Sequence, residues 1–372
     1  MRVVIGTGGT AGHVFPALAT ADRLRDRLGA EVSFVGRRDG QEARLVPEAG
    51  YVLETVEALP FRRRPSVATL LAPFAALRAA GRCRAVVRGA DAVLGMGGFV
   101  SVPVALAARR ERVPLVVHEQ NATPGLANRV AMRWALAAAV SFGETTSHLP
   151  GRVRAVVTGN PVRDPILRVR EERKSLRAEA ATTLGLEPAR RTVVVFGGSQ
   201  GARRLNEATV DATRILSERE DLQILLLTGP RNHEAVAGRM RETGALRVRT
   251  APFLDRMELA YAAADLMVCR AGATTVAELT ACAVPAVVVP YPYATGKHQE
   301  ANARALQRAG AAMVVADGAA TGHGLADQVR HLLDRPERLA SMAEAARVLG
   351  RPEAADAMAE LVASIAKGGP VR

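Results

Sequence analysis

The chain has 372 residues, which is long for one hydrophobic core and suits two domains of ordinary size. Its 50 lysine and arginine residues outnumber 37 aspartate and glutamate residues, for a net charge of +13. This excess reflects either an arginine-rich composition or attraction to anionic substrates or an anionic membrane surface. Nucleic acid is not the expected partner, because aromatic residues make up only 3% and no basic stripe is interleaved with stacking side chains.

Three cysteines, Cys83, Cys269 and Cys282, are far apart and lack the spacing of metal ligands, so we expect reduced thiols in the core and no metal site. The sequence enters a predicted strand at residue 2, which leaves no room for a signal peptide. No apolar run approaches the ~18 residues that span a bilayer. We therefore expect a soluble or peripherally attached protein.

Short β-branched runs alternate with longer helical stretches rich in alanine, leucine and arginine, a pattern typical of parallel sheets built from βαβ units. In the first half we predict strands at 2–6, 31–36, 52–56, 92–95, 114–118, 138–142 and 155–158. In the second half we predict strands at 192–197, 222–228, 247–250, 265–269, 285–290 and 312–315. The fold class is therefore α/β, with two parallel-sheet domains.

The stretch of about 161–191 contains a charged helical segment and no predicted strand, so the domain junction is placed there. The first domain is expected to comprise residues 1–161, with terminal helices at about 340–372 packing back on it. The second domain is expected to comprise residues 162–339.

Two glycine-rich turns each follow an apolar strand and enter a helix, which is the arrangement of an anion site. The first is Gly6-Thr7-Gly8-Gly9-Thr10-Ala11-Gly12-His13, and the second is Gly197-Gly198-Ser199-Gln200-Gly201. His13 stands beside the first turn, where an imidazole can accept a proton from a substrate hydroxyl. It can equally be an ordinary histidine at a helix start.

The first turn also fits the dinucleotide pattern weakly, as Gly6-x-Gly8-x-x-Ala11. The next strand ends at Gly36-Arg37-Arg38 instead of the acidic residue that would hold an NAD ribose. The arginines keep NADP, and hence a reductase, open as an alternative.

Other strand ends carry polar or small residues, and the carboxyl ends of parallel strands face the ligand in open sheets. The segments are Leu94-Gly95-Met96-Gly97-Gly98-Phe99, His118-Glu119-Gln120-Asn121, the stretch from Arg270 to Glu278, and Lys297-His298-Gln299-Glu300-Ala301-Asn302. Glu278 can accept two hydrogen bonds from a ribose diol, or can simply be favoured by the dipole of its helix. The amides and imidazole of the last segment suit sugar hydroxyls.

Taken together, these segments resemble the MurG family, the N-acetylglucosaminyltransferases that convert lipid I to lipid II in peptidoglycan synthesis. The matching stretches occur in family order over nearly the whole chain. They are Gly8 to Leu18, Leu94 to Ser101, His118 to Asn121, Gly159-Asn160-Pro161-Val162-Arg163, Gly197 to Arg203, Arg270 to Ala273, and His298-Gln299-x-x-Asn302.

The resemblance implies a GT-B glycosyltransferase with two Rossmann-like domains facing a central cleft, which inverts the donor sugar in one displacement. His13 is the candidate base, and Glu119 is a secondary candidate that can instead orient groups. The implied UDP-GlcNAc contacts are Thr10, Ala11, Gly12, Asn121, Arg163, Ser199, Leu254, Gly272, Ala273, Thr274, Thr275, Glu278, His298 and Gln299. The implied contacts of the acceptor diphosphate are Gly8, Gly9, Thr10, Gly97 and Gly98.

The same resemblance implies UDP-GlcNAc and a polyprenyl-diphosphate acceptor, lipid I, as substrates, with no obligatory cofactor. No Asp-x-Asp motif is present, so helix N-termini and Arg163 would neutralise the leaving diphosphate in place of a metal. It also implies a peripheral protein on the cytoplasmic face of the cell membrane. Leu70, Leu71, Phe74 and Leu77, near several arginines, either contact an anionic membrane or form a core helix.

Two segments depart from the family pattern. Residues 57–65 read Glu-Ala-Leu-Pro-Phe-Arg-Arg-Arg-Pro where a glycine-rich acceptor loop is expected, and Thr295-Gly296-Lys297 replaces an acidic position before His298. A related UDP-sugar transferase with another lipid or natural-product acceptor is therefore an alternative. A UDP-sugar epimerase of the same fold and a non-catalytic sugar-nucleotide sensor are more distant ones.

Overall fold

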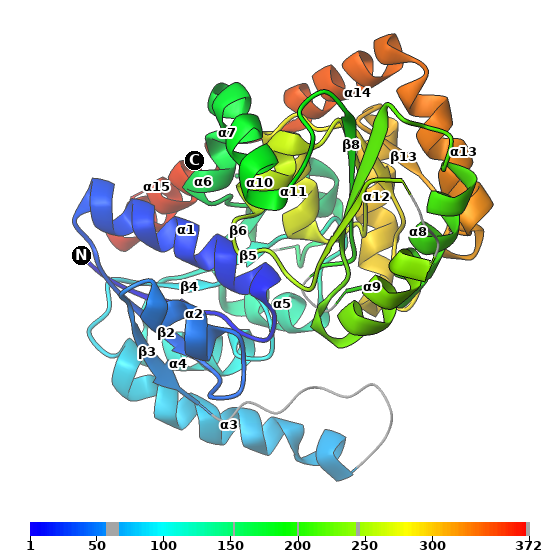
Figure 1. The fold of residues 1–372 in the computed structure, drawn as a ribbon. Helices are drawn as coiled ribbons and strands as arrows, with labels where there is room; N and C mark the ends of the chain where they lie inside the picture. Colours follow the sequence, from blue (N-terminus) through cyan, green and yellow to red (C-terminus); the bar gives the residue numbers. More distant parts are fainter. Residues whose placement is uncertain (57–66, 152, 199–200, 243–245, 370–372) are drawn as a thin grey trace. The chain divides into compact units, whose positions relative to one another are not determined.

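The computed structural model describes the chain except residues 57–66, 152, 199–200, 243–245 and 370–372, and it leaves the side chains of 67–76 and 241–242 undescribed. The chain divides into two compact units. Unit 1 comprises Met1–Arg163 and Arg351–Arg372, and unit 2 comprises Asp164–Gly350. Each unit is built around one parallel sheet (Figure 1).

The described residues of unit 1 form a sheet of seven strands in the order β3-β2-β1-β4-β5-β6-β7. They are Arg2–Gly6 (β1), Glu31–Gly36 (β2), Val52–Thr55 (β3), Ala92–Gly95 (β4), Leu115–Glu119 (β5), Ala137–Val140 (β6) and Arg154–Val157 (β7). The order reverses between β1 and β4, which makes their carboxyl ends the point where open α/β sheets bind ligands. Gly6 pairs with Gly95 there, so the turns that follow β1 and β4 begin side by side.

Helices cover both faces of this sheet, because its strands are apolar on both sides. They are α1 (Ala11–Leu28), α2 (Glu42–Glu48), α3 (Val67–Val87), α4 (Ser101–Glu111), α5 (Leu126–Ala131) and α15 (Ala354–Ala366). Val3 and Ile5 join a buried cluster with α1 and α15. Val4 points the other way and joins a cluster with α3 and α4, which lie together in Figure 1.

The described residues of unit 2 form a sheet of six strands in the order β10-β9-β8-β11-β12-β13. They are Arg191–Phe196 (β8), Leu222–Leu227 (β9), Val248–Ala251 (β10), Leu266–Cys269 (β11), Ala286–Val288 (β12) and Ala312–Val314 (β13). The order reverses between β8 and β11, where Phe196 pairs with Cys269. The second glycine-rich turn and the segment from Arg270 therefore start at neighbouring strand ends.

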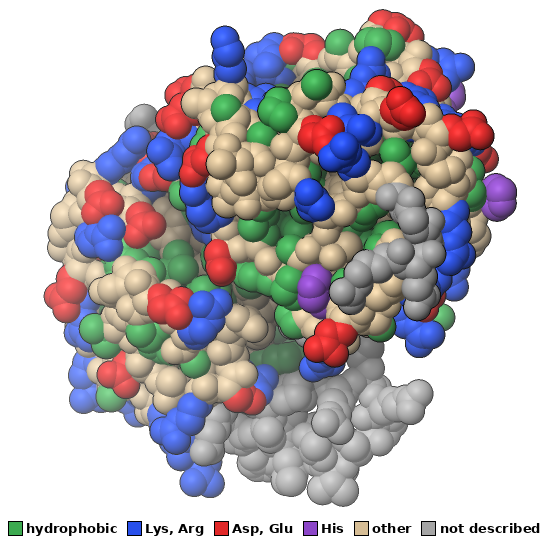
Figure 2. All heavy atoms as spheres, in the orientation of Figure 1, with side chains coloured by type: hydrophobic (Ala, Val, Ile, Leu, Met, Phe, Trp, Pro, Cys, Tyr) green, Lys and Arg blue, Asp and Glu red, His purple; other side chains and the backbone are tan. Residues whose placement is uncertain are grey.

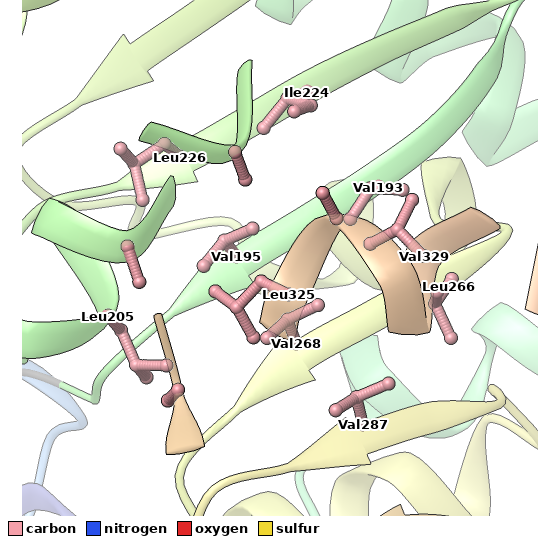
Figure 3. Close-up of a cluster of buried hydrophobic side chains, with 14 of the residues drawn as sticks. Val193, Val195, Leu205, Ile224, Leu226, Leu266, Val268, Val287, Leu325 and Val329 are labelled. Atoms are coloured by element: carbon pink, nitrogen blue, oxygen red, sulfur yellow. The ribbon is translucent and has the colours of Figure 1, made fainter. Parts of the chain in front are cut away.

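The helices of unit 2 are α6 (Asp164–Leu167), α7 (Val169–Leu184), α8 (Arg203–Ile215), α9 (His233–Glu242), α10 (Met257–Ala263), α11 (Ala273–Ala281), α12 (His298–Arg308), α13 (Gly322–Leu333) and α14 (Pro336–Leu349). On one face of the sheet, Val195 and Leu226 pack with Leu205 of α8 and Leu325 of α13 (Figure 3). This packing fixes the strand ends that carry the polar loops.

The last two helices belong to different units. Helix α14 contacts α11 and α13 of unit 2, whereas α15 contacts α1 and β4 of unit 1. Of the terminal stretch expected at about 340–372, the part up to Gly350 therefore lies in unit 2, and only the part from Arg351 lies in unit 1. The difference arises because α14 packs beside its neighbour α13 before the chain returns.

The α/β class and all the predicted strands are confirmed, with each strand end within two residues of its predicted position. The three cysteines are buried thiols, as expected. Within the described part of the chain, no helix is long and apolar enough to cross a membrane. On the face drawn in Figure 2, basic side chains (blue) are interspersed with acidic ones (red), so the charge excess is not gathered into one patch there.

Candidate active site

The turn between β1 and α1 is tight and depends on glycine. Gly9 has a φ of 104°, which side-chain-bearing residues rarely adopt, and the extended Thr10 is the N-cap of α1. The turn after β4 crosses so closely that a Cβ on Gly98 would overlap the carbonyl oxygen of Gly8. The structure thus brings Gly8, Gly9, Gly97 and Gly98 together at the N-terminus of a long helix, where the dipole favours an anion.

His13 lies in the first turn of α1, with Ala11 and Gly12. Its Nδ1 is 3.2 Å from Oγ1 of Thr10, and its Cδ2 would be 2.7 Å from a Cβ placed on Gly97. The imidazole therefore rests against the bare backbone of Gly97. Because Gly97 also has a φ of 97°, a side chain there would be strained and would displace the ring.

Glu119, at the end of β5, is buried and its two oxygens already accept hydrogen bonds. Oε1 accepts from the backbone N–H of Asn121 at 2.9 Å and from its Nδ2 at 3.2 Å. Oε2 accepts from the N–H of Gly125 at 3.0 Å and from Nδ2 of Asn128 at 2.8 Å. Burial raises the pKa of Glu119, although these donors oppose the shift. The geometry suits a group that holds the 119–128 turn better than one that takes a substrate proton.

His118, the residue before it, is fully enclosed. Its Nε2 is 3.3 Å from both the carbonyl oxygen of Gly159 and Oγ of Ser141. Burial lowers the pKa of His118 to about 4, against a smaller opposing effect of the Gly159 carbonyl, and the nearby His13 lowers it further. His118 is therefore a neutral imidazole that ties β5 to the segment after β7.

Arg163 lies at the end of unit 1 and stacks on an aromatic ring that the sequence analysis did not single out. Its guanidinium carbon is 3.8 Å from the ring centroid of Phe15, a cation–π contact that orients the guanidinium. Phe15 is two residues from His13 in α1, so one helix places both the imidazole and the support of the arginine. In sequence, Phe15 is one apolar residue among many in this helix.

A carboxylate of the protein itself holds the first turn. Oε2 of Glu42, in α2, accepts the N–H of Gly9 at 3.1 Å. Of the two arginines on which the NADP alternative depended, Arg37 pairs with Asp39 at 2.6 Å and Arg38 is exposed.

In unit 2, the glycine-rich turn after β8 is packed closely against its surroundings. A Cβ on Gly197 would overlap Ala202, and one on Gly201 would overlap the carbonyl oxygen of Thr228 at the end of β9. Gly201 also has a φ of 72°. Ser199, the predicted donor contact in this turn, lies outside the described residues.

The start of α11 follows β11 with Gly272 as its N-cap, so Ala273, Thr274 and Thr275 form its first turn. Glu278, one turn further, is buried, and its Oε2 accepts a hydrogen bond from the hydroxyl of Tyr261 at 2.9 Å. Tyr261 in α10 is fully buried, and burial raises its pKa well above the usual value. No sequence pattern indicates Tyr261, because its contact with Glu278 depends on packing between two helices.

The loop after β12 is organised by Arg270 and Gln299. Nη1 of Arg270 is 2.6 Å from Oδ1 of Asp317, and its guanidinium lies 5.4 Å from the ring centroid of Tyr291. Oε1 of Gln299 accepts the N–H of Tyr291 at 2.9 Å. His298 turns back on its own loop, with Nδ1 2.6 Å from the carbonyl oxygen of Thr295. Leu254 is distinct from this loop and lies between β10 and α10.

Each unit therefore presents a helix N-terminus beside an ionisable side chain. Unit 1 combines a glycine-lined anion loop with the imidazole of His13. Unit 2 combines the start of α11 with the buried carboxylate of Glu278. The groups of unit 1 can bind a phosphate and move one proton, and those of unit 2 can bind a phosphate and hold a diol. Among the described residues, no three histidine, cysteine or acidic side chains group as metal ligands.

Comparisons with known proteins agree with these features. Residues 3–140 match the glycosyltransferase family 28 N-terminal domain, and residues 192–361 match the glycosyltransferase family 28 C-terminal domain. A relative from Halothermothrix orenii is 42% identical over 99% of this chain and 100% of its own length, and one from Nocardioides sp. is 44% identical over 100% of both. Both are named UDP-N-acetylglucosamine--N-acetylmuramyl-(pentapeptide) pyrophosphoryl-undecaprenol N-acetylglucosamine transferase.

Comparison with solved structures agrees with the similarity in sequence. The crystal structure of Acinetobacter baumannii MurG matches with a TM-score of 0.76 and 31% identity, over 98% of this chain and 99% of that one. A putative UDP-N-acetylglucosamine 2-epimerase from Listeria monocytogenes matches with a TM-score of 0.70 over 99% of this chain and 97% of that one. At 16% identity, the second likeness concerns the fold alone.

The buried His118 predicts a specific pH dependence of stability. Its pKa is about 4 in the folded chain and near 6.5 when exposed, so between these values the unfolded chain binds a proton that the folded chain does not. The contribution of His118 is fully present above pH 6.5 and is lost as the pH falls through this window, by about 3 kcal/mol. We expect His118→Gln, which cannot titrate, to flatten the fall in the free energy of unfolding between pH 6.5 and 4.

Urea unfolding at a series of pH values measures this difference. The matched control is His148→Gln, since His148 is exposed and its replacement should preserve the wild-type pH slope. The raised pKa of Glu119 acts in the opposite direction, so each variant is compared with wild type at the same pH. A wild-type slope in His118→Gln would contradict the assignment.

Proposed function

The chain belongs to the MurG family within glycosyltransferase family 28, and on that basis we propose that it transfers N-acetylglucosamine from UDP-GlcNAc to the muramoyl 4-hydroxyl of lipid I. The product is lipid II, used for peptidoglycan synthesis. The observation that carries the proposal is similarity over essentially the entire length to relatives named for this transfer. An end-to-end match includes both glycine-rich turns and the starts of α1 and α11.

The reaction is a single displacement at the anomeric carbon. The acceptor oxygen forms a bond to C1 as the bond from C1 to the UDP oxygen breaks, so the configuration inverts and no covalent enzyme intermediate forms. The acceptor hydroxyl proton passes to the base, which we assign to Nε2 of His13, because Nδ1 lies beside the Thr10 hydroxyl. The loop of Gly8, Gly9, Gly97 and Gly98 would hold the acceptor diphosphate.

The donor roles follow from the family motifs. Glu278 would accept the ribose hydroxyls, backbone near Leu254 would recognise uracil, and the turn at 272–275 would contact phosphate and sugar. Asn121, Gln299 and His298 would hold GlcNAc hydroxyls, while Thr10, Ala11, Gly12 and Ser199 would line the donor. Arg163, oriented by Phe15, would stabilise negative charge on departing UDP.

We assign Glu119 to positioning and not to proton transfer. Its oxygens accept four hydrogen bonds from Asn121, Gly125 and Asn128. A base must offer a lone pair within hydrogen-bond reach of the substrate proton. Glu119 instead fixes the backbone of Asn121, which the family motif places at the sugar.

The transfer is tested by incubating the protein with radiolabelled UDP-GlcNAc and a short-chain lipid I analogue while UDP release is followed in parallel. Labelled lipid product together with UDP is the expected result. UDP release or a new UDP-sugar without lipid product would instead indicate another acceptor or an epimerase. Thermal stabilisation by UDP, with no effect of NADP, would exclude the reductase alternative.

In the same assay, His13→Ala is expected to lower turnover by about 10²- to 10⁴-fold, the usual contribution of a general base. UDP affinity, measured by calorimetry, should be unchanged. His148→Ala serves as the control, because this histidine is exposed and belongs to neither glycine-rich turn. Retained turnover in His13→Ala would rule out the base role.

A second prediction concerns the hydroxyl of Tyr261, which orients Glu278. Tyr261→Phe should weaken UDP binding by roughly 10- to 100-fold, since a hydrogen bond to a charged group contributes about 1.5–3 kcal/mol. The loss should be smaller for 2′-deoxyuridine diphosphate, which offers Glu278 only one hydroxyl. Calorimetry with both nucleotides measures the difference.

The matched control is Tyr51→Phe in unit 1, which likewise removes a hydroxyl that donates to a carboxylate, Asp22, at 2.7 Å. It should leave both affinities unchanged. Equal losses for the two nucleotides in Tyr261→Phe would mean that the hydroxyl supports the fold of unit 2 and not recognition of the ribose.

We further propose that the protein acts as a peripheral protein at the cytoplasmic face of the cell membrane, where a water-soluble sugar nucleotide can meet a lipid-linked acceptor. The side chains of Leu70, Leu71 and Phe74 lie outside the described residues, but they belong to helix α3. Leu77, on the same helix, is 43% exposed, and Arg78 beside it is exposed. An exposed apolar side chain next to arginine supports contact with an anionic headgroup layer.

Vesicle co-sedimentation tests this proposal. Binding should rise with the fraction of anionic lipid, and the double substitution Leu71→Glu and Phe74→Glu should abolish it, because carboxylates are repelled by anionic headgroups. Val348→Glu, at an exposed position of α14, should bind like wild type. Sedimentation insensitive to both lipid charge and the double substitution would contradict the proposal.

A further inference from the structure

Glu42 is a buried carboxylate that the proposed reaction does not use. It lies in α2 with no exposed surface, and both its oxygens accept backbone hydrogen bonds. Oε2 accepts from Gly9 at 3.1 Å, and Oε1 accepts from Arg37 at 2.9 Å. One side chain thus joins the turn after β1 to the turn after β2.

Three glycines enclose this carboxylate. A Cβ on Gly8 would lie 2.5 Å from Oε1 of Glu42, one on Gly36 would lie 2.6 Å from its Cγ, and one on Gly40 would overlap its carboxyl group. A side chain at any of these positions would push Glu42 away. The glycine content of both turns is therefore matched to the volume of this one carboxylate.

The contacts continue from Glu42 to the imidazole. Glu42 holds the N–H of Gly9; the next residue, Thr10, places its Oγ1 3.2 Å from Nδ1 of His13. On its other side, the imidazole rests against Gly97. The position of Gly9 consequently sets the position of Thr10, and Thr10 and Gly97 together set the ring.

We propose that Glu42 is a positioning residue for the transfer: its two oxygens fix the turn at Gly8 to Thr10 and thereby hold His13 and the acceptor diphosphate in register. The proposal rests on the proposed function for its kinetic consequence. Bridging two N–H donors requires two acceptor oxygens. Glutamine keeps the shape but turns one oxygen into an NH₂ donor, so one of the two N–H groups must lose its partner.

The test compares Glu42→Gln with Glu48→Gln. Both replace a carboxylate of α2, but Glu48 is solvent-exposed and pairs with Arg44 of its own helix at 2.8 Å. At saturating substrates, Glu42→Gln should lower kcat by about 10- to 100-fold, since misplacing a reacting group by about 1 Å has an effect of that size. The KM for UDP-GlcNAc should change far less than kcat, because most of the proposed donor contacts, Glu278 and Gln299 among them, lie in unit 2. Glu48→Gln should match wild type in both.

A second readout needs no substrate. This readout is the NMR signal of the His13 imidazole in histidine-labelled protein, which is identified by its loss in His13→Gln. Its chemical shift should change in Glu42→Gln and should stay the same in Glu48→Gln. The signals of His233, His298, His323 and His331 in unit 2 should not move in either variant. This readout decides the role of Glu42 even if the wild-type protein does not glycosylate lipid I.

Gly40→Ala tests the same contact without changing Glu42, because the added Cβ would displace the carboxyl group of Glu42. Gly40 does not have a left-handed backbone conformation, so alanine adds no backbone strain there. It should reproduce both effects of Glu42→Gln. Gly81→Ala, where nothing lies within 4 Å of the added Cβ, is the matched control. A lower melting temperature with unchanged kcat and an unshifted His13 signal in Glu42→Gln would overturn the proposal and leave Glu42 a purely structural residue.

Discussion

The candidate site of unit 1 depends on the close approach of two backbone segments, the turn after β1 and the turn after β4. The pairing of Gly6 with Gly95 starts both turns at one edge of the sheet, and the absence of a Cβ on Gly98 lets them touch. His13 then rests against Gly97 in the turn after β4, and Glu42 accepts a hydrogen bond from Gly9 in the turn after β1. Glycine is required at Gly98 because a side chain there would overlap the backbone of Gly8 in the other turn. This fit explains why a dinucleotide-like pattern occurs in a turn whose Gly9 amide has a carboxylate partner.

Much of this fold could be predicted because parallel sheets have a strong signature in sequence. Strands covered on both faces must be apolar at consecutive positions, as in Thr192 to Phe196, where each residue is buried. The intervening helices are long and rich in alanine and leucine, so their hydrophobic pattern is easily distinguished from the short apolar runs of the strands. Strand ends carry the chemistry in such sheets, and this rule led from the strands to His118, Glu119 and the segment beginning at Arg270.

The supporting residues could not be predicted in the same way. Phe15, Glu42 and Tyr261 lie within helices, and each acts on a partner far away or on another element, so no local pattern distinguishes them from ordinary helical residues. Glu119 presents the opposite difficulty. It stands at a strand end where a base is expected, and only the positions of Asn121, Gly125 and Asn128 reveal that its oxygens are already engaged. Sequence therefore locates polar groups at strand ends better than it distinguishes their roles.

The division of the two units along the chain has a consequence for biosynthesis. Unit 2 is one continuous segment, Asp164–Gly350, whereas unit 1 needs residues from both sides of it. Met358 and Val362 of α15 are fully buried with Leu24 of α1 in the unit 1 core, so residues 1–163 emerge from the ribosome with that apolar face of their sheet uncovered. Unit 2 can complete its core first, although it is translated second. The half that carries His13 remains unfinished during this interval, and a nascent chain cannot hold the turn after β1 on a closed core until α15 has been made.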